Sequence, residues 1–230
     1  LISSIKYCKK NHPYLKIKTI IIDDYSNKEN LEKVKKLTSE NEINIIPLNL
    51  KNFKTKINDQ KTRETFSNLA SLLQSFELAK DISEDLILFA EDDYLHSETM
   101  LIEMIETYER VASQLKKDII MCPSDYPYLY MNNEKTNILI GSKRHWRTIN
   151  QTLCTFMTTK NLMDKYFDNF YKTCLDRNDP FEKYINEIYT KEVCISPLKS
   201  LSLHVTNVNS SYGLSPFLDY KKLWNEQELN

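Results

Sequence analysis

Glycine is almost absent from this sequence, which contains only Gly141 and Gly213 among 230 residues. A phosphate-binding P-loop needs two glycines beside a Lys and a Ser or Thr, and a dinucleotide-binding loop needs three glycines close together. Neither pattern occurs. If the protein binds phosphates, a metal ion and side chains must therefore provide most of the contacts.

Other features are missing as well. The five cysteines contain no CxxC pair, which argues against a structural zinc site and predicts buried thiols in a reducing compartment. No apolar run approaches the roughly 18 residues that span a bilayer, and the N-terminus lacks a signal-peptide pattern. A net charge of −1 argues against a nucleic-acid partner. We expect a soluble cytoplasmic protein, with peripheral attachment at the inner membrane as an alternative.

Strand-like and helix-like patterns alternate along the chain. Strands are expected at 16–22, 43–48, 85–90, 118–122, 193–197 and 201–205. Helices are expected at 1–10, after Ser26, at 61–80, from 97, at 160–174 and from Asp179. This order predicts an α/β fold with an open, mostly parallel sheet and helices on both faces, in a single domain. Since such folds normally begin with a strand, the helical start also predicts that a first strand has been lost.

Paired acids follow two of the expected strands. Asp23 and Asp24 end the first one, and Glu91, Asp92 and Asp93 come directly after the apolar run LILFA. Ligands of open α/β sheets bind outside the carboxyl ends of the strands, where clustered carboxylates repel one another unless a cation neutralises them. Oxygen-rich sites favour Mg²⁺ or Mn²⁺. The alternative is that these acids cap helices or end the strands in solvent.

The stretch IIIDDYS, followed later by LILFAEDDYL, resembles the nucleotide-sugar-binding half of GT-A glycosyltransferases, with family 2 as the nearest broad match. The EDD form is similar to inverting N-acetylglucosaminyltransferases. The resemblance implies a Rossmann-like nucleotide-sugar-binding half at 1–122, an acceptor and catalytic half at 123–205, and a C-terminal extension at 206–230.

Roles for individual acids follow from the same resemblance. It implies that Asp93 binds a Mn²⁺ or Mg²⁺ ion that bridges the donor diphosphate, and that Glu91 and Asp92 support the ribose and the metal shell. Asp24, together with Asp23, is then expected to contact uracil or another base.

Two further residues are candidates for the donor site. His204 is similar in position to a histidine that completes the metal shell in GT-A enzymes, although a lone histidine after an apolar strand is more often a packed residue. Arg63 begins a helix after a lysine-rich loop and is a candidate donor contact.

An inverting transferase needs a general base to deprotonate the acceptor hydroxyl. The candidates are Asp176, Asp179 and Glu182 near the start of a late helix, with Asp179 and Glu182 preferred. The alternative is structural: Asp179, Pro180 and Glu182 stand at the spacing of a helix N-cap, N1 and N3, as in a capping box.

The segment Arg144, His145, Trp146 and Arg147 places two arginines around two aromatic residues. It is a candidate for holding a diphosphate or an acidic acceptor, with Trp146 stacked on a sugar face. The alternative is a solvated loop anchored by its tryptophan.

These observations predict a metal-dependent glycosyltransferase of the hexosyltransferase class that acts on a nucleotide sugar, with UDP-sugars and inversion favoured. The acceptor would be a saccharide or another hydroxyl compound, and bacterial surface polysaccharide synthesis is the expected setting by analogy. A sugar-1-phosphate nucleotidyltransferase is an alternative, although the glycine-rich N-terminal loop of those enzymes is missing. A non-catalytic carbohydrate-binding protein of the same fold is another alternative, whereas DDYSN is a poor match to a metal-dependent phosphatase.

Overall fold

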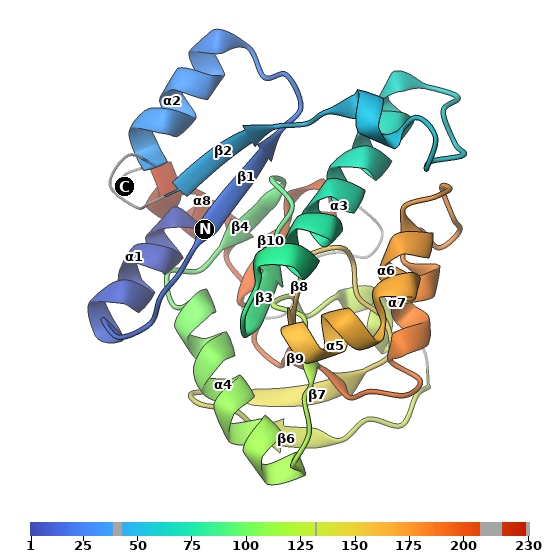
Figure 1. Ribbon diagram of the computed structural model, residues 1–230. Coiled ribbons are helices and arrows are strands. Elements are labelled where there is room, and N and C mark those ends of the chain that lie inside the picture. The colour runs from blue at the N-terminus through green and yellow to red at the C-terminus, as the bar shows by residue number, and fades with distance from the viewer. Residues whose placement is uncertain (39–42, 132, 208–217, 229–230) are drawn as a thin grey trace.

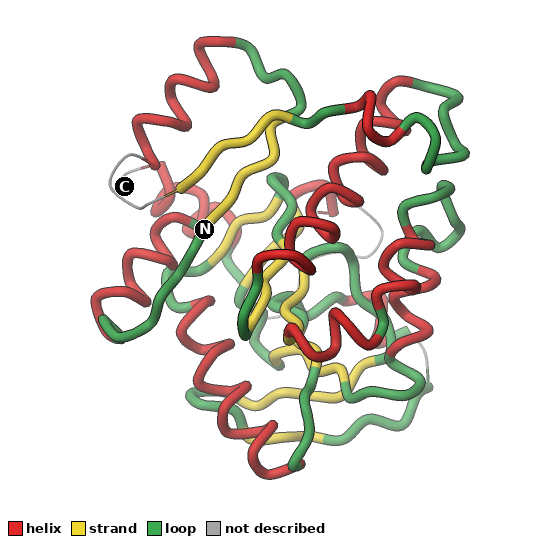
Figure 2. The backbone as a smooth tube through the Cα atoms, viewed as in Figure 1, coloured by secondary structure: helices red, strands yellow, loops and turns green. Residues whose placement is uncertain are grey.

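The strands of the protein are short and form three sheets in the part of the chain that the structure describes (Figures 1 and 2). This computed structural model describes residues 1–230 except 39–42, 132, 208–217 and 229–230. The strands are β1 (Thr19–Asp23), β2 (Ile43–Pro47), β3 (Leu86–Phe89), β4 (Tyr94–His96), β5 (Ile120–Met121), β6 (Ile138–Ile140), β7 (His145–Ile149), β8 (Phe156–Thr159), β9 (Cys194–Pro197) and β10 (Ser202–His204).

Helices separate most of the strands in the first half and cluster between β8 and β9 in the second. They are α1 (Ile2–Asn11), α2 (Lys28–Thr38), α3 (Arg63–Ile82), α4 (Met100–Leu115), α5 (Lys160–Lys165), α6 (Phe167–Thr173), α7 (Lys183–Ile188) and α8 (Tyr220–Glu228). Three short 3-10 turns are η1 (Leu50–Phe53), η2 (Pro127–Tyr130) and η3 (Val205–Asn207). Among the described helices, none has the length and apolar character that crossing a membrane requires.

The main sheet has six strands in the order β3-β8-β5-β9-β7-β6. Only the β5–β9 pair is parallel, and the other four neighbouring pairs are antiparallel. The α/β class is confirmed, but the sheet is mixed rather than mostly parallel. The reason lies in the second half: β6 and β7 form a hairpin closed by the Gly141 amide, which donates to the Arg144 carbonyl, instead of being joined by a helix.

The two faces of the main sheet pack against different helices, because successive side chains of a strand point to opposite faces. Phe156, Ile120 and Cys194 face one hydrophobic cluster, and the residue after each of them faces the other. Helices α3, α5, α6 and α7 cover the first face, and α1 and α4 cover the second (Figure 1). The sheet therefore carries helices on both faces, as the sequence predicts.

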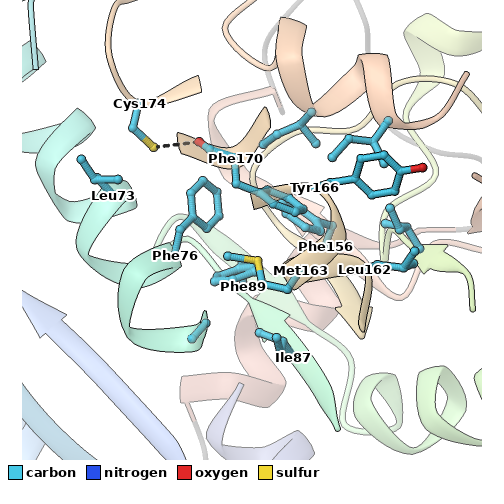
Figure 3. Packing of buried hydrophobic residues seen from close by; sticks show 14 of the residues in the cluster. Leu73, Phe76, Ile87, Phe89, Phe156, Leu162, Met163, Tyr166, Phe170 and Cys174 are labelled. Carbon is cyan, nitrogen blue, oxygen red and sulfur yellow. Dashed lines mark hydrogen bonds between the residues drawn. The ribbon is translucent and has the colours of Figure 1, made fainter. Parts of the chain in front are cut away.

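Aromatic rings fill the first cluster between α3, β3, β8 and α6 (Figure 3). The rings of Phe76 and Phe89 meet edge to face at 4.8 Å, and Phe156 stacks on Phe170 at 6.0 Å. Burying a ring of this size stabilises the fold by roughly 1.5–3 kcal/mol. Phe89 and Phe156 are also paired across β3 and β8, so this core fixes the ends of both strands.

Two smaller sheets complete the fold. β1 and β2 pair in parallel from Thr19 to Asp23, and β4 pairs with β10 in antiparallel register. Helix α2 begins after Asn27, whose side chain accepts a hydrogen bond from the Asn30 amide, so Asn27 rather than Ser26 supports its start. All five cysteines are buried free thiols, as expected.

Candidate functional site

The β4–β10 ladder brings Asp93 and His204 together. Tyr94, the first residue of β4, lies opposite His204, the last residue of β10, and the Val205 amide donates to the Asp93 carbonyl. Asp93 Oδ2 lies 2.7 Å from His204 Nε2 and also accepts a hydrogen bond from the Thr206 hydroxyl at 2.9 Å. Two residues that are more than a hundred positions apart in the sequence thus share one hydrogen-bonded cluster.

Aromatic stacking orients the His204 ring. The ring of Tyr94 lies 4.7 Å from the imidazole of His204 at an interplanar angle of 14°. The hydroxyl of Tyr94 is hydrogen-bonded to that of Tyr126 at 2.6 Å, and both residues are buried. Since this hydroxyl pair restrains the Tyr94 ring, the ring provides a fixed surface against which the imidazole of His204 packs.

Two glutamates lie near this pair. Glu91 follows β3, and its carboxylate accepts a hydrogen bond from the Thr155 hydroxyl at 3.3 Å. Glu182 precedes α7, is buried, and lies 3.8 Å from the thiol of Cys154. The charge of Glu182 acts on both Glu91 and His204, so the three groups share one electrostatic environment with Asp93.

Burial and mutual repulsion change the proton affinities of these groups. Burial raises the pKa of Glu91 to about 7, and the negative charge of Asp93 adds to this increase. Residue 91 as a whole is exposed, and one oxygen of its carboxylate accepts the Thr155 hydrogen bond. Burial likewise raises the pKa of Glu182.

The pKa values of Asp93 and His204 shift in opposite directions. The hydrogen bond from His204 lowers the pKa of Asp93, with help from Thr206 and against the effect of burial. Burial acts to lower the pKa of His204, but the hydrogen bond and charge of Asp93 raise it overall. The pair is therefore stabilised as a carboxylate with an imidazolium.

Few of the described side chains in this cluster are placed to bind a metal ion. Among the described residues, no group of three or more His, Cys, Asp or Glu side chains is arranged to hold a metal. Asp93 Oδ1, however, is shielded from solvent and accepts no hydrogen bond from another described residue. An unsatisfied carboxylate oxygen of this kind is a suitable ligand for a cation that takes its remaining ligands from phosphates.

The other predicted donor residues make no described hydrogen bond or ion pair with Asp93. Asp23 accepts a hydrogen bond from the Ser26 amide and thereby closes its own turn at the end of β1. Asp24 and Asp92 are exposed. Arg63 is the exposed first residue of α3, where Thr62 caps the helix. None of the described hydrogen bonds or ion pairs of Asp93 involves these four residues.

The predicted capping box before α7 is wrong. The helix begins at Lys183, and Glu182 stands at the N-cap without a side-chain cap hydrogen bond. Asp179 is exposed, and Asp176 accepts a hydrogen bond from the Asn58 side chain. Of the three candidate bases, only Glu182 lies in the electrostatic environment of Glu91 and His204.

The basic segment is not a ligand-binding loop, because residues 145–149 form β7 inside the main sheet. Trp146 is fully buried, and its indole N–H donates to Glu103, so stacking on a sugar is ruled out. Arg147 is buried in an ion pair with Asp125, with 3.0 Å between Nη2 and Oδ1. Both predictions are wrong because the strand turns these side chains inward.

The remaining two residues of that segment differ from each other. Arg144 donates to the Lys199 carbonyl and lies 3.9 Å from Glu103, so its guanidinium contacts groups of the protein itself. His145 is exposed on β7. Residues 144–147 therefore do not act together as an anion-binding group.

Three residues of the cluster were not foreseen from the sequence. Thr206 contacts both Asp93 and His204, Thr155 contacts Glu91, and Cys154 contacts Glu182. Of these three, only Thr206 could have been found from the sequence, because it lies two positions after the predicted His204. Thr155 becomes relevant only through the pairing of β3 with β8, and Cys154 only through its contact with Glu182 before α7.

The sequence matches no protein-family model and no curated protein at a significant level. The functional interpretation therefore depends on the site itself.

Proposed function

We propose that the protein is a metal-dependent glycosyltransferase that moves a sugar from a nucleotide-sugar donor, with UDP-sugars favoured, to a hydroxyl acceptor. The observation that supports this most is the Asp93–His204 pair at the end of the β4–β10 ladder, with Glu91 and Glu182 in the same electrostatic environment. Carboxylates that gather at strand ends beside a histidine suit a cation and a diphosphate.

Two protein ligands are sufficient for such a site. Mg²⁺ and Mn²⁺ in phosphate-processing sites are often held by one or two carboxylates, and substrate phosphates and water complete the shell. Asp93 would supply the carboxylate, and His204 would supply the neighbouring nitrogen after losing the proton that it shares with Asp93, because only a neutral imidazole binds a metal ion. When bound, the ion would neutralise charge on the departing nucleoside diphosphate.

Glu182 is proposed as the general base, in preference to Asp179. A base works best when its pKa lies near the operating pH, and burial raises the pKa of Glu182 toward that range. Its carboxylate would accept the proton of the acceptor hydroxyl as that oxygen attacks the anomeric carbon in line. Inversion at that carbon is the expected stereochemistry.

The first half of the chain would hold the nucleoside. Asp24, with Asp23, would contact the base beyond the end of β1, and Glu91 and Asp92 would support the ribose and the metal shell. Arg63 is a candidate contact to the donor from the start of α3. A role in polysaccharide synthesis and a cytoplasmic location are proposed by analogy only.

A thermal-shift screen of nucleotide sugars with and without Mn²⁺ tests the proposal. At a donor concentration near 100 times Kd, binding stabilises the native state by about 2.7 kcal/mol, which corresponds to a Tm rise of about 5–10 °C for a chain of this size. The shift should need Mn²⁺ and should disappear in Asp93→Ala.

Glu109→Ala, an exposed acid on α4, is the matched control and should retain the shift. If no nucleotide sugar stabilises the wild-type protein, or if Asp93→Ala keeps the full shift, the proposed site is wrong. Release of UDP from the stabilising donor, with and without an acceptor, would then separate a transferase from a non-catalytic binding protein.

A further inference from the structure

The segment between β7 and β8 contacts both glutamates of the site. Thr155 is fully buried; its hydroxyl oxygen accepts a hydrogen bond from the Glu91 amide at 3.1 Å and donates to Glu91 Oε2 at 3.3 Å. Its neighbour Cys154 is also buried and directs its thiol to Glu182 Oε1. Two consecutive residues therefore hold two carboxylates that come from distant parts of the chain.

Strand register explains how Thr155 reaches Glu91. The β3–β8 ladder ends at the pair Phe89–Phe156, both of which are buried in the aromatic core (Figure 3). Just beyond that pair, backbone pairing stops, and the Thr155 hydroxyl accepts the hydrogen bond of the Glu91 amide instead. Because Phe156 is anchored in the core, the position of the Thr155 hydroxyl is fixed by the fold.

Thr155 restrains Glu91 at both its backbone and its carboxylate. A surface glutamate has several accessible rotamers, and fixing one of them costs conformational entropy when a ligand binds. A hydroxyl that holds the carboxylate beforehand removes part of that cost, as outer-shell partners do for metal ligands. The main-chain hydrogen bond also fixes the direction in which the chain leaves β3 toward Asp92 and Asp93.

We propose that Thr155 is a positioning residue that fixes the Glu91 carboxylate in the donor site. This inference relies on the proposed function for what Glu91 contacts, but the restraint itself can be measured without any substrate. The hydroxyl of Thr155 makes both hydrogen bonds to Glu91. Serine, which keeps a hydroxyl, should therefore preserve the position of Glu91, whereas the isosteric valine should not.

The test compares Thr155→Val and Thr155→Ser with the wild-type protein. Amide hydrogen exchange, followed by NMR, should show the Glu91 amide exchanging about tenfold faster in Thr155→Val, since one hydrogen bond of about 1.4 kcal/mol is lost. Thr155→Ser should stay within about threefold of the wild-type rate. The dissociation constant for UDP with Mn²⁺ should likewise rise in Thr155→Val and stay close to the wild-type value in Thr155→Ser.

Thr158→Val, on the adjoining strand β8, is the matched control. Thr158 is buried like Thr155, but its hydroxyl has no hydrogen-bond partner among the described residues. Removing that hydroxyl should leave both the Glu91 exchange rate and UDP binding unchanged. A merely structural effect of a buried valine in this part of the chain would instead appear in both variants.

The outcomes separate the two proposals. If Glu91 exchange is unchanged in Thr155→Val, Thr155 does not position Glu91, whatever the protein binds. If exchange rises as expected but the wild-type protein binds no UDP with Mn²⁺, the positioning stands and the proposed function fails. Should Thr155→Val not fold, Thr155→Ala provides the same comparison with a smaller side chain, and equal rates in alanine and serine variants would overturn the inference.

Discussion

Replacing Arg147 by Met removes the cation of a buried ion pair, and the consequence can be worked out from the structure. Arg147 Nη2 lies 3.0 Å from Asp125 Oδ1, and the exposed fractions of the two side chains are 8% and 1%. Removing one partner of such a pair costs about 3–5 kcal/mol, because the other charge stays buried. The Tyr130 hydroxyl still donates to Asp125 Oδ2 at 2.7 Å, so we expect a loss of about 3 kcal/mol.

Calorimetry or circular dichroism would measure this loss as a shift in Tm. One kcal/mol corresponds to about 2–4 °C for a chain of this size, so Arg147→Met should melt about 6–12 °C below the wild-type protein. His145→Ala is the control, because His145 is exposed on the same strand and should change stability by no more than about 0.5 kcal/mol.

The opposite pattern would refute this reasoning. If Arg147→Met melts within about 1 °C of the wild-type protein while its affinity for a phosphate-containing ligand falls, Arg147 binds ligand and the pair with Asp125 is not structural. The double variant with Asp125→Asn gives a further check. Once Arg147 is removed, Asp125→Asn should cost less than it does alone, because the two side chains interact.

Further predictions concern Gly141 and the two glutamates. A Cβ at Gly141 would lie 2.4 Å from the Trp146 ring, so Gly141→Ala should lose about 1–3 kcal/mol in urea unfolding, and an unchanged midpoint would contradict this packing. The folded-state pKa of Glu91 is raised from 4.5 to about 7, so the native state binds the extra proton and loses stability as pH rises through that interval. Without metal, the Tm of wild type should therefore fall between pH 5 and 7 relative to Glu91→Gln; parallel curves would be inconsistent with a buried carboxyl. Glu182→Gln should lower kcat about 100-fold or more while UDP affinity stays the same, and an equal loss of both would argue against a general base.

Continuous apolar runs made β1, β2 and β3 predictable, whereas β4 was not expected. β1 and β3 consist mainly of β-branched and aliphatic residues, and each was placed within a few residues. β7 and β8 were missed because HWRTI and FMTT contain polar residues that are buried only through tertiary partners, such as Asp125 for Arg147. Strand direction was also out of reach, because β8 pairs antiparallel to both β3 and β5 through contacts that no local pattern encodes.

Some residues of the candidate site could be predicted from the sequence, and others could not. Asp93 and His204 could be proposed from the ends of apolar runs, and the structure places them in one hydrogen-bonded pair. Trp146 was misassigned because an aromatic residue between arginines looks the same whether a loop exposes it or a strand buries it. Thr155 could not be foreseen, since a threonine acquires its role only when the β3–β8 register sets it beside Glu91.

Titration of UDP into the protein by calorimetry, with Mn²⁺ and then with EDTA, tests the central claim most directly. The account predicts binding by the wild-type protein that needs Mn²⁺, and a loss of about tenfold or more in affinity for Asp93→Asn. Asp93→Asn keeps the size of the side chain and should remain folded. UDP binding that is equally strong in EDTA, or unchanged in Asp93→Asn, would contradict a cation held at the end of the β4–β10 ladder.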